Sequence, residues 1–597
     1  MIGSRPISEK LLRKFGRIVE RTFQLVAATL ALLFLGSGIL FLWNGHVTET
    51  IWDMWHLYGL GLTQPFFRAA IEKYGNHSIF FPSVVWLIDI RFFHNNQQLL
   101  FIFGLILLVA AALLLITAAW QDQTISRTAK LIATLLIIAA VFWMNKAWIT
   151  SIGPFSCICG LAVVGAFVSF HALACMRNRT VSRWRPTVLL VAFGLVSSFS
   201  YGSGFAVWPT LLCLGWSARL PLRYLTTITL VGCIAAVIYK MMPGAAPNIL
   251  PENAIFIGTG LRRLCSLIGA PCFYAATAWS SAKIPSEAAL SSPIHVVCGA
   301  IGITLAAVGS VPRLLRRDLS PSKLQLIALG VVIFNLVAIA FIVVGRTAQM
   351  HISPGEVLAP RYTFWSSLFW GGLALLWIQH IDAHEWLRWP SFLLLLALPI
   401  VIFPDHYHRA AWARYMHLLS DSAATSLING VHDDEAAQFL SRYPERVYRV
   451  AQLLRARRLD MFASRVHEWI GKKSSQVFIA NDKGTSIQAH CYIDAYLKCD
   501  NGEPAARITG SFLKAHSEAP RIFVILDPSQ RICGIARGFS TSNLLNRFFY
   551  GNKFPRNRII GYIRAYNAAL TYMVHTADNG ELSTAGAIVH TPAKETH

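Results

Sequence analysis

The chain has 597 residues, of which 54% are hydrophobic and only 14% are charged, and its mean hydropathy is +0.48. Soluble globular chains carry about a quarter charged residues, so this composition excludes a disordered chain, a collagen-like chain and a protein that is soluble throughout. The formal net charge of +23 fits the excess of Lys and Arg in cytoplasmic loops of membrane proteins. No basic helix face or aromatic-basic motif indicates a nucleic-acid partner.

Apolar stretches before residue 405 predict a multi-pass α-helical membrane protein, since about 20 apolar residues cross a bilayer. Eleven of them lie at 24–43, 97–119, 130–147, 152–174, 187–201, 205–218, 224–242, 295–311, 324–345, 363–379 and 390–404. The stretch 259–280 is also apolar, and its crossing stays open. If it is re-entrant or interfacial and the N-terminus is cytoplasmic, the basic clusters at 177–185, 219–223 and 313–323 all face the cytoplasm. We therefore predict 11 spans in the bacterial inner membrane, with a periplasmic or extracellular tail.

Three long loops are expected on the outer side of the membrane, at 44–96, 243–294 and 346–362. The first is too long for a simple connector. Its many Trp, Tyr and Phe residues suit helices that lie in the membrane interface. Loops above a rigid helical bundle are where we expect a functional site.

The tail that follows the predicted transmembrane domain, 1–404, divides into two parts. A helical connector is expected over 405–474, where Asp433 or Asp434 is a plausible helix cap and Pro444 separates two helices. Short strands with turns such as NDKG and DPSQ between them predict a small antiparallel β-sandwich over 475–597. If the tail is periplasmic, Cys491 and Cys499 form a disulfide or remain free thiols, and both alternatives stay open.

One carboxylate stands out as a candidate general base. Asp53 lies about ten residues past the first apolar stretch, in the segment IWDMWHLYG. Trp52 and Trp55 flank it, so we expect partial desolvation, which makes a carboxylate a better base. The alternative is that Asp53 caps an interfacial helix. No HExxH or paired-Cys metal motif is present, and the need for a divalent metal ion is undecided.

Other polar residues near the predicted membrane surface are candidates for substrate binding. Arg346 and Arg361, with Tyr362 after it, bracket one outward loop, and the planar guanidinium suits phosphate; a lipid-headgroup anchor is the alternative. His77 would orient a substrate or make a structural hydrogen bond. Two further motifs remain ambiguous. The glycines of SYGSGFAVWP form a tight turn or permit close approach to a substrate, and Asp89 and Arg91 pair or snorkel.

Several motifs, taken in order, resemble the GT-C integral membrane glycosyltransferases, and especially GT-C-like bacterial membrane proteins. Asp53-Met54-Trp55 resembles their acid beside Trp in the first loop, and Asn76-His77 before Phe-Phe-Pro resembles their Asn-Glu-His-Arg run, of which the Glu and Arg are absent here. SYGSGFAVWP and GRTAQ…APRYTFW resemble their glycine segment and Arg-Tyr loop. LLRARRLDMF, ARITGSFLK and RICGIARG resemble their post-membrane helices and terminal β-domain.

The resemblance implies transfer of a sugar from a polyprenyl-phosphate donor to a hydroxyl of a periplasmic glycan or glycoconjugate, with inversion. Asp53 would be the general base. Arg361, with Arg346 and Tyr362, would hold the phosphate leaving group, and the remaining candidates would position sugar or acceptor; these are His77, Asn76 and Trp55. The β-domain would bind or orient glycan. No cofactor beyond the lipid-linked donor is implied.

Three alternatives of other kinds stay open. One is an O-antigen-ligase-like transferase, which also needs outward arginines and a base. A second is a transporter or flippase of a lipid-linked glycan, although the matching broken helices of transporters are not evident. A third is a non-enzymatic glycan-binding scaffold, for which Asp53→Asn would be silent.

Overall fold

The computed structural model describes residues 6–74, 77–177, 184–244, 257–278, 292–315, 321–480, 487–514, 521–540, 557–578 and 580–589. The chain divides into two compact units. Unit 1 comprises 1–44, 70–84 and 100–410, and unit 2 comprises 45–69, 85–99 and 411–597. Unit 2 therefore begins a few residues after the boundary expected at 404, and it also takes two segments of the first predicted outward loop.

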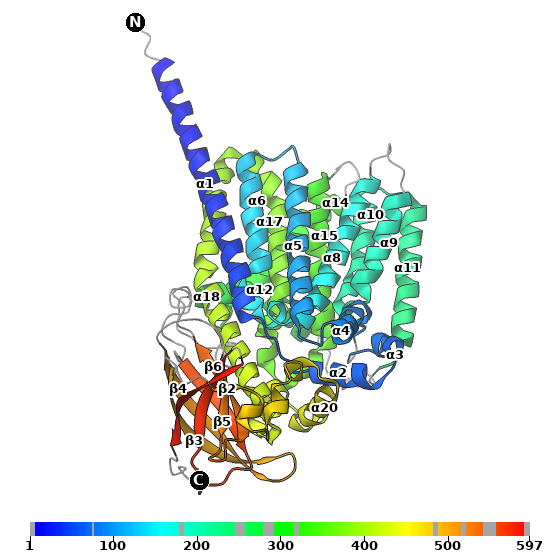
Figure 1. The fold of residues 1–597 in the computed structure, drawn as a ribbon. Helices are drawn as coiled ribbons and strands as arrows, with labels where there is room; N and C mark the ends of the chain where they lie inside the picture. Colours follow the sequence, from blue (N-terminus) through cyan, green and yellow to red (C-terminus); the bar gives the residue numbers. More distant parts are fainter. Residues whose placement is uncertain are drawn as a thin grey trace. The chain divides into compact units, whose positions relative to one another are not determined.

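Unit 1 is a bundle of helices, several of them long (Figure 1). Its longer helices are α1 (Pro6–Gly45), α5 (Gln98–Gln121), α6 (Arg127–Phe142), α8 (Gly153–Met176), α9 (Trp184–Ser198), α10 (Val207–Ser217), α11 (Leu222–Met241), α12 (Ile257–Thr277), α14 (Ile294–Leu315), α15 (Lys323–Gly345), α17 (Thr363–Ala383) and the first part of α18 (Glu385–Asn429). Short helices join them: η1 (Met144–Lys146), α7 (Ala147–Thr150), η2 (Gly202–Ala206), α16 (Thr347–Ile352), η3 (Pro354–Leu358) and η4 (Pro360–Tyr362).

Eight helices in the described residues are long and apolar enough to cross a membrane, which confirms the membrane-protein class. They cover Gly16–Gly45, Gln98–Gln121, Arg127–Thr150, Gly153–Met176, Leu222–Met241, Ile294–Leu315, Lys323–Gly345 and Glu385–Asn429. Eleven were predicted. Two of the others, α9 and α10, have 15 and 11 residues, which at 1.5 Å per residue is short for an apolar core of about 30 Å. The helix α17 has the length but is interrupted by Ser, Gly and Trp.

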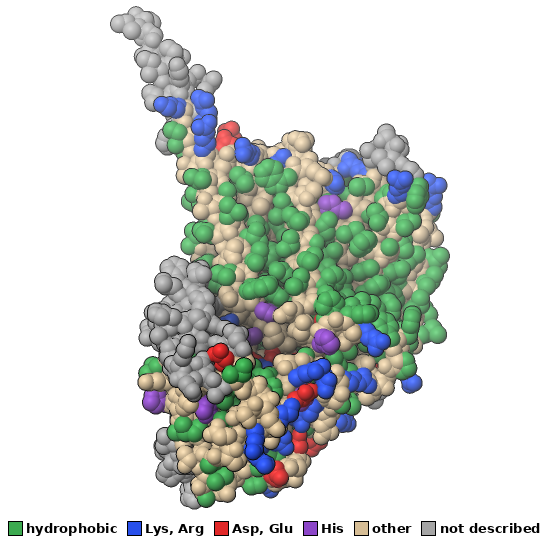
Figure 2. Space-filling view, viewed as in Figure 1, with side chains coloured by type: hydrophobic (Ala, Val, Ile, Leu, Met, Phe, Trp, Pro, Cys, Tyr) green, Lys and Arg blue, Asp and Glu red, His purple; other side chains and the backbone are tan. Residues whose placement is uncertain are grey.

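The surface of the bundle has the distribution of side chains that a bilayer requires. Hydrophobic side chains cover its flank, and Lys and Arg gather at one end (Figure 2). Exposed apolar residues of the helices of unit 1 include Leu32, Leu113, Ile234 and Val308. Because a soluble bundle would place polar residues on such a face, the band indicates contact with lipid.

Unit 2 contains a β-barrel, where the sequence predicted a sandwich. Its strands are β1 (Val431–His432), β2 (Ile479–Ala480), β3 (Ile487–Cys499), β4 (Pro504–Lys514), β5 (Arg521–Leu526), β6 (Ile532–Ser540), β7 (Asn557–Arg564), β8 (Met573–Asp578) and β9 (Glu581–Val589). They are ordered β1-β3-β4-β7-β6-β5-β8-β9-β2, and β3 also pairs with β9, in parallel. This pairing closes the sheet, so no second layer is needed to cover its apolar face.

Buried and exposed residues alternate in β3, where Ile487, Ala489, Cys491 and Ile493 point into the core and the residues between them point outward. The thiols of Cys491 and Cys499 are both buried and free, so the predicted alternative of a disulfide is wrong. The two residues share this one strand and lie eight positions apart, too far for an S–S bond along extended backbone.

Helices complete unit 2. They are α2 (Met54–Thr63), part of α4 (Phe80–Phe92), the end of α18, α19 (Asp434–Leu440) and α20 (Pro444–Arg457). The predicted signals are confirmed: Asp433 is the N-cap of α19 and accepts a hydrogen bond from the Ala436 amide at 3.1 Å, and Pro444 opens α20. The helix α2 packs on α20. Gly59 makes the close approach possible, since a Cβ there would lie 3.3 Å from Val450.

Candidate functional site

Four of the predicted site residues gather around one tyrosine in unit 1. Tyr201 lies between α9 and η2, its ring 4.8 Å from the imidazole of His77 and stacked on Trp365 at 6.1 Å. Burial raises the pKa of Tyr201, which keeps its hydroxyl protonated. The charges of Arg346 and Arg361, and the hydroxyl of Tyr362, also act on this group. The cluster therefore joins loops that are far apart in the sequence.

The two arginines are held by neighbours in the same loop. Arg346 follows α15 and donates from Nη1 to Oε1 of Gln349 at 2.9 Å. Arg361 forms an ion pair with Glu356 and lies 5.1 Å from the ring centroid of Tyr362. Its side chain is 38% exposed. A guanidinium has five N–H donors, so one carboxylate partner leaves donors for a second anion such as phosphate.

The loop that carries Glu356 is fixed from inside the bundle. Asp405 on α18 accepts from Asn145 at 2.9 Å and pairs with Arg409 at 3.3 Å. The Arg409 guanidinium lies 5.0 Å from the ring of Tyr274, whose hydroxyl donates to the carbonyl of Leu358 in η3. Buried charges in a membrane domain are costly and are retained where they position something. Here they fix the position of η3.

His77 is neutral at physiological pH. Burial, and then the charge of Arg346, lowers its pKa to about 4. Its peptide is held by reciprocal backbone hydrogen bonds with Tyr74, each of 2.9 Å. A neutral imidazole donates from one nitrogen and accepts at the other. The arginines therefore supply the positive charge of this cluster, while His77 is suited to bind a hydroxyl.

Gly202 is required beside His77. A Cβ at residue 202 would overlap Nδ1 of His77 and lie 3.2 Å from the Tyr239 hydroxyl. We expect Gly202→Ala to lower the free energy of unfolding by about 1–3 kcal/mol, the usual cost of overpacking, and to displace the imidazole. Thermal melting of the protein in detergent measures this. Gly258→Ala is the control, because nothing lies within 4 Å of a Cβ there. Equal melting temperatures for the two variants would contradict the packing argument.

Sequence reasoning missed three members of this cluster. Tyr201 lies in the motif SYGSGFAVWP, which was interpreted only through its glycines. Glu356 was one of several acidic residues expected on the outer side of the membrane. Lys146 lay at the end of a predicted span, yet it is 1% exposed, and its ammonium lies 5.3 Å from the ring of Phe364. Its helix η1 packs against η4, which carries Arg361. A lysine inside an apolar run was the available signal.

The proposed base lies in unit 2. Asp53 occupies the N-cap position of α2 but makes no capping hydrogen bond with its side chain. It is exposed, so the expected desolvation by its Trp neighbours is not found. Trp55 is instead fully buried, and within the described ranges its Nε1 has no hydrogen-bond partner. The carboxylate of Asp53 is thus free to meet a substrate. Asn76 lies outside the described residues.

The loop that leads to Asp53 is anchored by a buried carboxylate. Oδ2 of Asp460 accepts hydrogen bonds from the Thr50 amide, at 3.1 Å, and from the Thr50 hydroxyl. The Asp460 amide in turn donates to the His94 carbonyl at 2.8 Å. At Trp52 the backbone turns left-handed, with φ of 51°. A bulky residue keeps such a conformation only when the surrounding structure fixes it. The hydrogen bonds of Asp460 contribute to this.

The same carboxylate makes the stability of the protein depend on pH. Burial, and then Glu49, raises the pKa of Asp460 to about 8, whereas an unfolded Asp titrates near 4. Between these values the folded state retains a proton that the unfolded state has lost. Stability therefore falls as pH rises through this window, by up to about 1.4 kcal/mol per pH unit.

We expect Asp460→Asn to remove this dependence, because the amide cannot ionise. The margin by which its melting temperature exceeds that of the wild type should grow steadily from pH 5 to pH 8. Thermal melts in detergent at pH 5, 6.5 and 8 measure the difference. Asp53→Asn, an exposed change in the anchored loop, should keep the pH slope of the wild type. If the melting temperature of Asp460→Asn depended on pH as strongly as that of the wild type, the role of this proton would be contradicted.

One further prediction is settled by the described residues. Asp89 and Arg91 do not pair, since Asp89 is fully buried and Arg91 is exposed, and burial raises the pKa of Asp89 to about 7. Among the residues that the structure describes, no three His, Cys, Asp or Glu side chains are grouped so as to hold a metal ion.

Comparisons with known proteins provide no family assignment. The chain matches no family profile, no curated protein and no solved structure.

Proposed function

We propose that this protein is a membrane glycosyltransferase of the GT-C type, which moves a sugar from polyprenyl phosphate to a hydroxyl of a periplasmic glycan or glycoconjugate. The observation that carries the proposal is that Arg346 and Arg361, each held by a neighbour in its own loop, both act through their charge on Tyr201, whose ring lies 4.8 Å from His77. Two fixed guanidinium groups beside neutral hydrogen-bonding side chains suit a substrate with one phosphate and many hydroxyls.

The helices that lead to this cluster support its position on the outer side of the membrane. The helix α15 begins at the last residue of the basic cluster at 313–323 and ends just before Arg346, and α9 begins within the cluster at 177–185 and ends before Tyr201. The cluster thus lies at the helix ends opposite to the basic residues. Since Lys and Arg collect in cytoplasmic loops, the opposite end is the outer one.

The proposed reaction is a direct displacement at the anomeric carbon of the sugar. The acceptor oxygen forms a bond to the anomeric carbon from the face opposite the phosphate, and the bond between that carbon and the phosphate oxygen breaks. The hydroxyl proton passes to Asp53. Arg361 and Arg346 bind the phosphate as its charge develops, with Tyr362 beside them, and the configuration inverts. His77, Asn76 and Trp55 position sugar or acceptor.

Mass spectrometry of cell-envelope glycans tests the proposal. A strain that lacks the gene is complemented with wild type, with Asp53→Asn or with Glu445→Gln, an exposed acid in the first turn of α20. We expect one hexose or pentose to be lost in the deletion and in Asp53→Asn only. Loss in the deletion alone would keep the reaction but reject the base. Loss of a whole glycan chain would favour a ligase. An unchanged glycan would overturn the proposal in favour of transport or a binding scaffold.

A further inference from the structure

Unit 2 contains a cleft of about 340 Å³ that the proposed reaction does not use. The end of α18, the helix α19 and the outer face of the barrel at β3, β4 and β7 form its walls. Its volume lies at the lower end of the range for small-molecule sites, about 300–1,000 Å³. The cleft therefore suits a small ligand or a short segment of a larger one.

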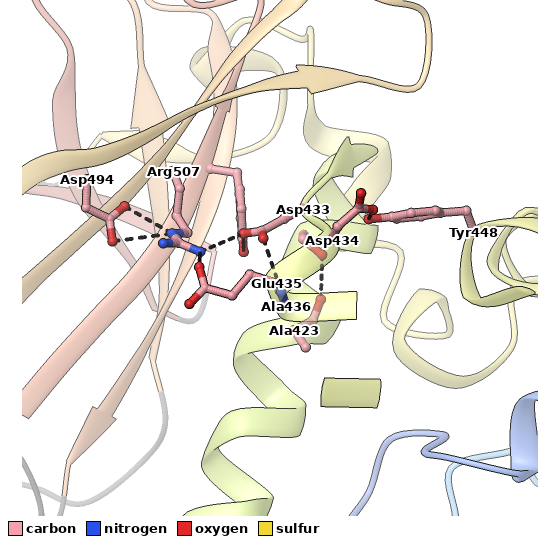
Figure 3. A network of polar contacts seen from close by, with 10 residues as sticks. Ala423, Asp433, Asp434, Glu435, Ala436, Tyr448, Asp494 and Arg507 are labelled. Atoms are coloured by element: carbon pink, nitrogen blue, oxygen red, sulfur yellow. Dashed lines mark hydrogen bonds and ion pairs between the residues drawn. The ribbon is translucent and has the colours of Figure 1, made fainter. Parts of the chain in front are cut away.

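Charged side chains on one wall are fixed by Arg507 (Figure 3). Its Nη1 lies 3.1 Å from Asp433 and 2.9 Å from Glu435, and its Nε donates to both oxygens of Asp494, at 3.1 and 3.3 Å. The Tyr562 hydroxyl also donates to Asp433, at 2.8 Å. Asp433 is almost fully buried and its role is structural, whereas Glu435 and Asp494 remain partly exposed in the cleft.

A second cation lies near these carboxylates. Arg558 on β7 lines the cleft and is exposed, and within the described part of the chain it forms no ion pair. Two guanidinium groups thus face two accessible carboxylates, Glu435 and Asp494. With the buried Asp433 counted, three carboxylates meet two guanidinium groups and leave a formal charge of −1, so the cleft does not favour an anion.

The remaining wall is apolar and aromatic. Tyr415 from α18 is 39% exposed, and Phe439 from α19 lies in the same lining. An aromatic ring offers a flat apolar face to C–H groups. Carboxylates accept hydrogen bonds from hydroxyl groups. Guanidinium groups donate hydrogen bonds to the oxygens of hydroxyl groups. A ligand ring that carries hydroxyls and also has an apolar face can therefore interact with every type of group that lines this cleft.

We propose that this cleft binds a neutral carbohydrate of one or a few sugar rings. The hydroxyls would donate to Glu435 and Asp494 and accept from Arg558, while one face of a sugar packs on Tyr415 or Phe439. The proposal names a binding site in unit 2 and does not depend on the transfer chemistry proposed for Asp53 and Arg361. It would hold equally for a glycan-binding scaffold.

Binding of saccharides to the full chain in detergent tests the site. The probes are short neutral hexose saccharides, the matching saccharides that contain uronic acid, and neutral and acidic peptides. The cleft variant is Glu435→Ala with Arg558→Ala, two exposed side chains whose loss leaves the contacts of Arg507 with Asp433 and Asp494 in place. Glu445→Gln is the control outside the cleft. Melting temperatures within a few degrees of the wild type establish that each variant is folded.

We expect at least one neutral saccharide to bind, its affinity to fall at least tenfold in the cleft variant and to be unchanged in Glu445→Gln. Asp53→Asn should bind it as the wild type does, so binding of the saccharide together with envelope glycans that are unchanged in the deletion strain would overturn the proposed reaction and leave this site standing. Equal affinity in the cleft variant and the wild type, no binding of any saccharide, or preferred binding of acidic saccharides or of peptides would each overturn the site.

Discussion

Alanine at Arg361 is expected to lower the rate of sugar transfer by about 10²–10³, the range measured when one donor that stabilises a developing anion is removed. The loss should fall mainly on kcat, because the phosphate gains charge as the sugar leaves. Arg361 already pairs with Glu356 and lies against Tyr362, so it is positioned before substrate arrives. Preorganised donors of this kind cost no rearrangement during the reaction.

Initial rates with purified protein and a polyprenyl-phosphate sugar measure the effect. Arg361→Lys should recover only part of the rate, since an ammonium keeps the charge but not the planar pair of donors. Arg223→Ala is the matched control, because this exposed arginine opens α11. A rate for Arg361→Ala within threefold of the wild type would show that the phosphate is bound elsewhere.

Much of the fold follows from local pattern. Apolar runs predict the helices of unit 1, and the alternation in β3 predicts its inward face. Closure of the barrel depends on the pairing of β3 with β9, which nearly a hundred residues separate. Alternation specifies which face of a strand is buried but not its partner, so a sandwich and a barrel give the same pattern. The apolar stretches 187–201 and 205–218 were counted as spans although α9 and α10 are short for one, because an apolar stretch does not by itself establish a crossing.

The site was predictable only where a residue type stands out from its surroundings. Arg346, Arg361 and His77 are polar residues beside apolar runs, and the structure brings them to one tyrosine. Tyr201 itself carries no such signal, because a tyrosine at the end of an apolar helix is ordinary at a membrane interface. The exposure of Asp53 was mispredicted because neighbours in sequence need not be neighbours in space. Trp55 points into the core of unit 2 while Asp53 points out.

Replacing Arg507 by methionine is expected to lower the stability of unit 2 by about 3 kcal/mol, the lower part of the range for removing one partner of a buried ion pair. The reason is the carboxylate left behind. Asp433 is 2% exposed, and without Arg507 its remaining partners are the Tyr562 hydroxyl and the Ala436 amide. Two neutral donors do not compensate for the charge of a buried carboxylate.

Hydrogen exchange of the full chain in detergent measures this locally, because peptides from β3, β4 and β7 report the opening of the barrel separately from unit 1. A loss of 3 kcal/mol corresponds to exchange that is about a hundredfold faster where the exchange rate follows the equilibrium constant for opening of the barrel. Asp433→Asn combined with Arg507→Met should recover part of the protection, since asparagine caps α19 without a charge. Arg558→Ala on the neighbouring strand should change exchange little. If Arg507→Met and Arg558→Ala exchange alike, the carboxylates around Arg507 are solvated well enough without it, and the network contributes nothing to the barrel.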